Sequence, residues 1–156
     1  MVGLLLFATV GCDQATKQIA RVSLGHHETR SFLGDVLRFE HAENPGAFLS
    51  FGAGLTDSAR FWIFTGLVIA FLLWASYRLF KDPDMNWSQT VGWTLVVAGG
   101  FGNVIDRVAK GSVTDFIFVG YGPIHTGIFN VADMAIVAGV ICLFFASSAK
   151  PAKGAH

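Results

Sequence analysis

Four long apolar segments, separated by polar connections, dominate the chain. A helix needs about 20 residues to cross a hydrocarbon core of ~30 Å, and each segment is close to that length. The segment at 61–78 is the clearest because it carries no charge before Arg78, whereas the first one turns polar from Asp13 onward. The pattern predicts an integral membrane protein, mainly α, with a single domain over residues 1–156. Its four transmembrane helices are expected at about 2–20, 61–78, 87–106 and 128–148.

Two connections between these segments contain strand-like patterns. Residues 36–41 alternate apolar with polar side chains, as a half-buried strand does. Residues 113–119 are similarly strand-like, and another apolar run, 48–51, follows turn residues. The two connections follow the first and the third span, so they lie on the same side of the membrane. We therefore expect a small β-sheet that rests on the membrane there.

Composition agrees with a membrane location. The chain is 53% hydrophobic and only 14% charged, whereas soluble domains carry about 25% charged residues. Its 15 Phe and 4 Trp fit a lipid-facing surface with interfacial aromatic side chains. The net charge is zero, so nothing indicates a nucleic-acid partner.

Two carboxylates stand out against this apolar background. Asp115 lies inside the strand-like run, and Asp133 lies near the start of the last apolar segment. An ionised side chain in hydrocarbon costs several kcal/mol, at least ~2.5, so such an acid indicates function. Two acids at one membrane depth also suggest a chemistry, because adjacent carboxylates can share a proton and activate water.

The other polar residues gather at the same membrane face. With helices of 1.5 Å rise per residue, Asp133 would lie ~8 Å inside a helix that starts near Ile128. Gly99, Asn103 and Asp106 follow the spacing of one helix face. The chain order brings a whole set of polar side chains to this face, namely Asp13, Asn44, Asn103, Asp106, Arg107, Asp115, Asn130 and Asp133.

Several of these residues also allow a purely structural interpretation. Asp106 with Arg107 is expected to form an ion pair that braces the site, and Asp13 with Lys17 can form an interfacial pair at i, i+4. Asn44 can be only a turn residue, and Asn130 can cap the fourth helix. The five His residues show no metal-ligand spacing.

Two other classes of membrane protein remain to be weighed. A transporter or ion-coupled channel would place its acids near the midplane and would often show an internal repeat, and neither is visible in the sequence. A non-catalytic scaffold leaves Asp115 and Asp133 without a purpose.

The polar blocks resemble those of the bacterial lipoprotein signal peptidases, the signal peptidase II family. The likeness extends over essentially the whole chain, in five blocks that occur in order: Asp13-Gln14-Ala15-Thr16-Lys17, Asn44-Pro45-Gly46-Ala47, Gly102-Asn103-Val104-Ile105-Asp106-Arg107, Val113-Thr114-Asp115-Phe116 and Phe129-Asn130-Val131-Ala132-Asp133.

The resemblance implies an aspartic endopeptidase that removes the signal peptide from diacylglyceryl-modified prolipoproteins, cleaving before the lipidated Cys. It implies that Asp115 and Asp133 form the catalytic dyad, with no cofactor and no metal. Other matching positions are expected to bind substrate or to brace the site: Asn44, Gly46, Asn103, Asp106, Arg107, Asn130, Ala132, Asp13 and Lys17. Phe48 and Leu49 depart from the family's usual residues, which affects the packing of the Asn44 loop.

The resemblance also implies a location. We expect a monomer in the bacterial cytoplasmic (inner) membrane, crossing it several times, with the sheet and the site facing the periplasm or the outside. Its partners would be lipid-modified prolipoproteins and membrane lipids. A simple count of Lys and Arg would instead place the 21–59 connection in the cytoplasm, and the resemblance overrules that count.

Overall fold

A computed structural model describes residues 1–25, 28–45 and 56–148. Four helices are present in this part of the chain: α1 (Val2–Ser23), α2 (Asp57–Lys81), α3 (Trp87–Lys110) and α4 (Val131–Ser148). Thr56 and Asn86 cap the starts of α2 and α3 with their side chains. Gly111 ends α3 in the left-handed conformation, which glycine adopts without a steric penalty.

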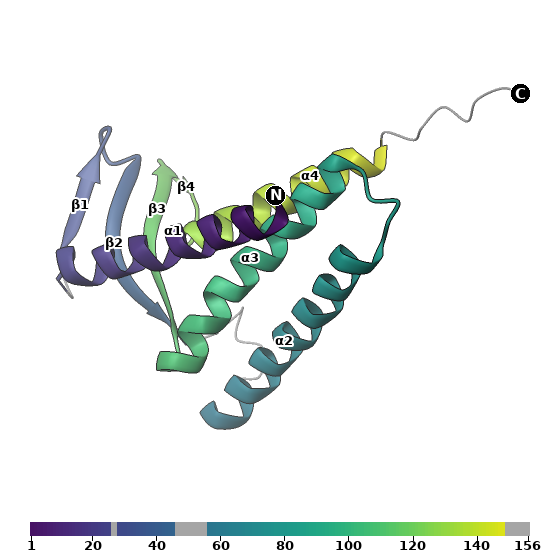
Figure 1. The fold of residues 1–156 in the computed structure, drawn as a ribbon. Coiled ribbons are helices and arrows are strands. Elements are labelled where there is room, and N and C mark those ends of the chain that lie inside the picture. Colours follow the sequence, from purple (N-terminus) through teal and green to yellow (C-terminus); the bar gives the residue numbers. More distant parts are fainter. Residues whose placement is uncertain (26–27, 46–55, 149–156) are drawn as a thin grey trace, which may run out of the picture.

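The strands form one antiparallel sheet beside the helices, in the order β1-β2-β3-β4. Their bounds are β1 (Thr29–Phe32), β2 (Leu37–Asn44), β3 (Val113–Tyr121) and β4 (Ile124–His125). In Figure 1 the sheet lies to one side of the helices, and the C-terminal half of α1 passes across it. The predicted strands at 36–41 and 113–119 are confirmed as parts of β2 and β3. Strands β1 and β4 were not predicted from the sequence.

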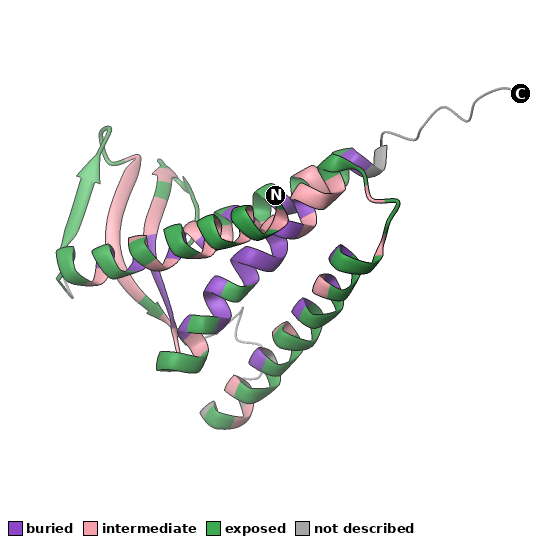
Figure 2. Cartoon of the chain, in the orientation of Figure 1, coloured by how far each residue is buried: buried purple, intermediate pink, exposed green. Residues whose placement is uncertain are grey.

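Helix α3 is the centre of the helical part. It packs against α1, α2 and α4, and among the described residues α2 packs against no other helix. Figure 2 shows α3 buried over much of its length, whereas α1 and α2 are mostly exposed. Close packing depends on glycine: a Cβ at Gly99 would lie 2.3 Å from the carbonyl oxygen of Ala132, and one at Gly102 would lie 2.5 Å from an Asp13 oxygen.

Hydropathy distinguishes the helices from one another. Within the described residues, one stretch, Phe61–Lys81 in α2, is both long enough and apolar enough to cross a membrane, and Val131–Ala146 in α4 is a shorter apolar helix. Helices α1 and α3 bury polar side chains against each other, which lowers their mean hydropathy. Each predicted span therefore coincides with a helix, while the crossing of a bilayer by all four stays a prediction.

Candidate functional site

Asp115 and Asp133 lie where the sheet meets the helices. Asp115 is the third residue of β3, and Asp133 is the third residue of α4. The segment between them returns along β3, because the backbone N–H groups of Phe116 and Ile117 donate to the carbonyl of Phe129 at 3.0 and 2.8 Å. This local pairing brings the start of α4 to the residue that carries the first carboxylate.

Helix α4 starts later than expected. It begins at Val131 rather than near Ile128, so Asp133 lies only about 3 Å along the helix axis from the first residue. The depth of ~8 Å that was expected from the sequence is therefore wrong. Asp133 belongs to the first helical turn, where unpaired backbone N–H groups favour negative charge.

Asparagine amides connect the two carboxylates. Asn130 donates from Nδ2 to Asp115 Oδ1 at 2.6 Å and to Asn103 Oδ1 at 3.1 Å. Asn103 in turn donates from its own Nδ2 to Asp133 Oδ1 at 2.8 Å. On the other side, Asn44 at the end of β2 donates to Asp115 Oδ2 at 3.1 Å. Asn44 is therefore a contact of the acid pair and not only a turn residue.

Asn130 also caps α4. The backbone N–H of Asp133 donates to Asn130 Oδ1 at 3.0 Å, and the backbone N–H of Asn130 donates to Asp133 Oδ2 at 3.2 Å. This reciprocal arrangement is a capping box. The structural interpretation of Asn130 is thus confirmed, and the same side chain bridges the acids as well.

The two acids differ in their exposure. Asp115 is only 3% exposed, whereas Asp133 is half-buried and lines an apolar groove of about 520 Å³ along α4. Burial raises the pKa of Asp115 to about 6. The hydrogen bonds from Asn44 and Asn130 oppose this rise, and the nearby charge of Asp133 adds to it. Burial thus favours the neutral form of the Asp115 carboxyl.

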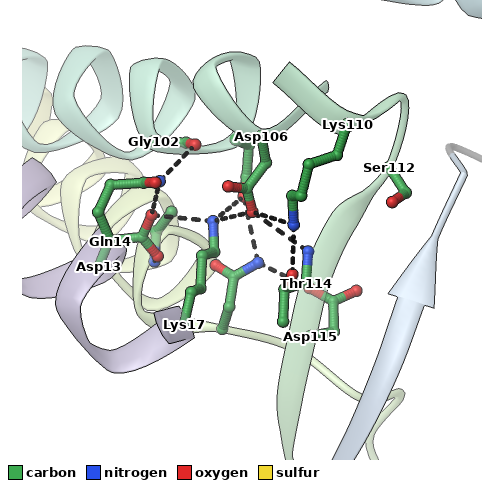
Figure 3. A network of polar contacts seen from close by, with 12 residues as sticks. Asp13, Gln14, Lys17, Gly102, Asp106, Lys110, Ser112, Thr114 and Asp115 are labelled. Atoms are coloured by element: carbon green, nitrogen blue, oxygen red, sulfur yellow. Dashed lines mark hydrogen bonds and ion pairs between the residues drawn. The ribbon is translucent and has the colours of Figure 1, made fainter. Parts of the chain in front are cut away.

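A buried ion cluster of Asp13, Lys17 and Asp106 lies near Asp115 (Figure 3). Lys17 is fully buried and pairs with Asp13 at 2.8 Å and with Asp106 at 3.2 Å, and it also donates to Asn103 Oδ1 at 3.0 Å. The Asp13–Lys17 pair that was expected at the interface is thus inside the protein. It joins α1 to the residues of α3 that contact the acids.

Ala132 contributes its backbone rather than its side chain. Its N–H donates to Asp13 Oδ1 at 2.9 Å. The same carboxylate accepts a hydrogen bond from Gln14, which also contacts the carbonyl of Gly102. Asp13 thus ties α1 to the first turn of α4 beside Asp133.

The expected ion pair between Asp106 and Arg107 is wrong. Asp106 pairs with Lys17, Arg21 and Lys110 instead, and no described carboxylate lies within ion-pair distance of Arg107. Consecutive residues on a helix point about 100° apart, so they do not face each other. Arg107 lies near enough to Asp115 and Asp133 to interact with their charges.

Sequence reasoning missed several side chains of this network. Arg21 and Lys110 both reach Asp106, and Thr114 donates its backbone N–H to the same carboxylate at 3.2 Å. The helical spacing could have found the two cations, because Arg21 follows Lys17 by four residues and Lys110 follows Asp106 by four. Gly46 and the apolar run 48–51, with Phe48 and Leu49, lie outside the described residues.

The fold and the site together define a class of protein. It is a helical membrane protein with a small sheet, in which two carboxylates meet at the junction of sheet and helices. Among the described residues, no group of three or more His, Cys, Asp or Glu side chains could hold a metal ion.

The comparisons with known proteins name the family. The family model for signal peptidase II matches residues 5–149, and the chain therefore belongs to the signal peptidase II family. It is 34% identical over 140 residues to a lipoprotein signal peptidase of Xylella fastidiosa, covering 88% of this chain and 82% of that one. A lipoprotein signal peptidase of Streptococcus pneumoniae is 32% identical over 148 residues, covering 94% and 91%.

A solved structure shares the fold. It is described as a bacterial membrane enzyme determined by the in meso method at 1.9 Å resolution, and it superposes with a TM-score of 0.80 at 31% identity. The match covers 96% of this chain and 94% of the other. The chain is thus a membrane-bound peptidase with the fold of its family.

Proposed function

We propose that this chain is an aspartic endopeptidase that removes the signal peptide from diacylglyceryl-modified prolipoproteins, cleaving before the lipidated Cys. The observation that carries the proposal is the pair Asp115 and Asp133, joined through Asn130 and Asn103 in a chain of hydrogen bonds. Family membership supplies the reaction, and the pair supplies the groups that would perform it.

The proposed roles of the two acids follow from their surroundings. Asp133 is more exposed, lies at the N-terminus of α4, and accepts hydrogen bonds from Asn103 and from the backbone of Asn130. It would act ionised and take a proton from the attacking water. Asp115, buried and with a pKa raised to about 6, would donate a proton to the scissile carbonyl oxygen. When the tetrahedral intermediate collapses, Asp133 would give the proton from water to the leaving amine, and Asp115 would take a proton back from a hydroxyl group of the intermediate. The pair would then be in its starting state.

The remaining site residues would hold this geometry. Asn44 and Asn130 bind the two oxygens of Asp115, and Lys17 with Asp13 and Asp106 fixes Asn103 from beneath. A second positive charge, Arg107, would stabilise the negative charge of the pair. Gly46 belongs to the same motif as Asn44 and stays a proposed site residue.

A lipid anchor on the substrate suits the surface next to Asp133. The groove on α4 that this acid lines is otherwise apolar, with Thr126, Phe129, Met134, Val137, Ala138 and Ile141. An acyl chain or an apolar signal segment in that groove would hold the scissile bond at the depth of the acids. Such anchoring lowers the entropic cost of reaching them.

We further propose a monomer in the bacterial inner membrane with four spans, both termini in the cytoplasm and the site facing outward. Labelling with an impermeant thiol reagent tests this topology after Cys12 and Cys142 have been replaced. A Ser31→Cys variant should react in intact cells and an Asp84→Cys variant should not. The opposite result would invert the orientation.

The decisive test of the reaction uses purified protein and a diacylglyceryl-modified precursor. Asp115→Asn and Asp133→Asn should each lower the cleavage rate by at least ~10³-fold, because the two groups act as a unit. Asp84→Asn is the matched control, since Asp84 is exposed in the connection between α2 and α3. Appreciable turnover by either dyad variant would end the assignment of the acids.

A further inference from the structure

Thr114, the residue before Asp115, has a hydroxyl group whose hydrogen-bonding capacity is fully used. The hydroxyl accepts hydrogen bonds from Arg21 Nε at 3.1 Å and from Lys110 Nζ at 2.5 Å, and it donates to Glu43 Oε1 at 2.8 Å. A hydroxyl has one donor and two acceptor positions, so these three bonds complete it. The side chain is fully buried, and Figure 3 shows it between Asp106, Lys110 and the strand.

The partner of Thr114 on the neighbouring strand depends on an irregularity in the sheet. Between Phe39 and Ala42 the register of β2 against β3 shifts by one residue. Beyond that point Glu43 stands opposite Thr114 and Asn44 stands opposite Val113. Without the extra residue, Ala42 would face Thr114 instead. A slip of one residue turns every side chain to the other face of the sheet, so this register needs a specific contact to hold it.

The hydrogen bond from Thr114 to Glu43 is such a contact. It joins two residues that stand directly opposite each other across the strands, and Ser112 and Lys110 hold the same carboxylate. Partial burial of Glu43 is outweighed by hydrogen bonds from Ser112, His41 and Thr114, which lower its pKa to about 2. Glu43 therefore remains an anion at neutral pH and attracts Lys110.

The register decides where Asn44 lies. In a strand, successive side chains point to opposite faces, so Thr114 and Glu43 share one face while Asn44 and Asp115 share the other. With Glu43 held opposite Thr114, Asn44 reaches the Oδ2 atom of Asp115 at 3.1 Å. Thr114 contacts neither carboxylate of the acid pair with its hydroxyl, and any effect it has must pass through the strand.

We propose that Thr114 is a positioning residue of the peptidase, whose hydroxyl locks β2 in the register that sets Asn44 against Asp115. This inference rests on the proposed role of Asp115. Glu43 is the acceptor that completes the lock, and Lys110 and Arg21 orient the hydroxyl toward it.

The test replaces the hydroxyl by a methyl group. Thr114→Val keeps the branched shape and the preference for strand, and it should lower kcat by roughly 10- to 100-fold, as small misplacements of reacting groups do, with KM changed less than about twofold. Thr114→Ser restores the hydroxyl and should return kcat to within about threefold of wild type. The thermal midpoint in detergent is measured for every variant, so that loss of folded protein is not taken for loss of rate.

Thr29 offers a matched control. It stands opposite Glu40 in the pairing of β1 with β2 and donates to that carboxylate at 3.4 Å, on the exposed edge of the same sheet. Thr29→Val should cleave at the wild-type rate. A wild-type rate for Thr114→Val, or equal losses in Thr114→Val and Thr114→Ser, would overturn the proposal.

If Thr114→Val does not fold, Glu43→Ala tests the same hydrogen bond from the other partner. Glu43 is partly exposed, so its truncation leaves no internal cavity, and kcat should fall in the same way. A wild-type rate for Glu43→Ala would then overturn the inference. Asp115→Asn in the same assay separates the two proposals. If it still cleaves, the proposed function fails, whereas an inactive Asp115→Asn beside a wild-type Thr114→Val removes only the positioning role.

Discussion

Asp115 is a carboxyl group whose charge the fold opposes. Burial is the main cause, and the nearby Asp133 adds to it, so that the pKa rises to about 6. A group with a raised pKa in the folded state contributes stability that is fully present below its unfolded pKa and is lost as pH rises through the folded pKa. For Asp115 this window runs from about 4 to about 6.

This gives a prediction about stability. Between pH 5 and pH 7.5 the wild-type protein should lose about 1 kcal/mol of unfolding free energy from this group, after allowance for partial solvent screening. Asp115→Asn should lack that loss, so its unfolding free energy relative to that of wild type should rise by about 1 kcal/mol over this range. Denaturant unfolding at the two pH values measures it. Asp84→Asn serves as control, and parallel behaviour of Asp115→Asn and wild type would contradict the prediction.

Asp106 is a buried carboxylate whose ion pairs are expected to stabilise the fold. It is almost fully buried, and its carboxylate faces Lys17 at 3.2 Å, Arg21 at 3.5 Å and Lys110 at 3.7 Å. Asp106→Asn keeps the shape and removes the charge, leaving Lys17 to Asp13 alone. We expect a loss of about 3–5 kcal/mol in unfolding free energy, accompanied by a loss of activity. If thermal unfolding is unchanged while cleavage is lost, Asp106 belongs with the reacting groups.

At the scale of elements, glycines set how closely the helices approach. A Cβ on Gly99 would lie 2.3 Å from the carbonyl oxygen of Ala132 in the first turn of α4, where backbone cannot yield easily. Gly99→Ala should therefore push α4 away and displace Asp133. Gly66→Ala, in α2, meets nothing within 4 Å and should be neutral or slightly stabilising.

The measurement is the cleavage rate together with the thermal midpoint in detergent. Gly99→Ala should lower both, by at least about tenfold in rate because a misplacement near 1 Å has that effect. If Gly99→Ala and Gly66→Ala behave alike, the packing of α3 on α4 does not control the site.

The elements also show what the sequence could predict. The helices were predictable because their apolar length is a local property, and β2 and β3 because alternation or apolar runs mark them. Strand β1 was missed since all its residues are exposed, so no burial pattern distinguishes it. Strand β4 has only two residues, too few for any pattern.

For the site, the sequence allowed us to predict which residues gather, but not which contacts form between residues that are distant in the chain. The acids and the asparagines were predictable as a set, because chain order brings them to one membrane face. Their actual partners were not. The contact of Asn130 with Asp115 depends on the path of the chain beside β3, and the lock at Thr114 depends on a shift in strand register.

At the scale of the whole molecule, the acids lie at one end of the helices rather than midway along them. Asp133 is in the first turn of α4, and Asp115 is on the adjoining sheet. With the proposed roles of the acids, a substrate would present its scissile bond at this end, beside the apolar groove that Asp133 lines.

We predict that the lipid on the substrate controls its cleavage. In detergent or liposomes, a precursor with its diacylglyceryl group should be cleaved at least about tenfold faster than the same precursor without it, since the anchor fixes depth and orientation. The comparison uses kcat/KM for the two forms. Equal values would show that anchoring does not select the substrate. Val137→Asp, which places a charge in the groove, should weaken the preference for the lipid.

The bond between Asp13 and the backbone of Ala132 has a consequence for biosynthesis. Among the described helices, α1 with Asp13 leaves the ribosome first and α4 with Ala132 and Asp133 leaves it last. A nascent chain that ends before α4 still lacks Asp133 and the bond that seats it. Proteolytic activity would therefore appear only after α4 has packed into place, and an incomplete chain would not cleave other proteins in the membrane.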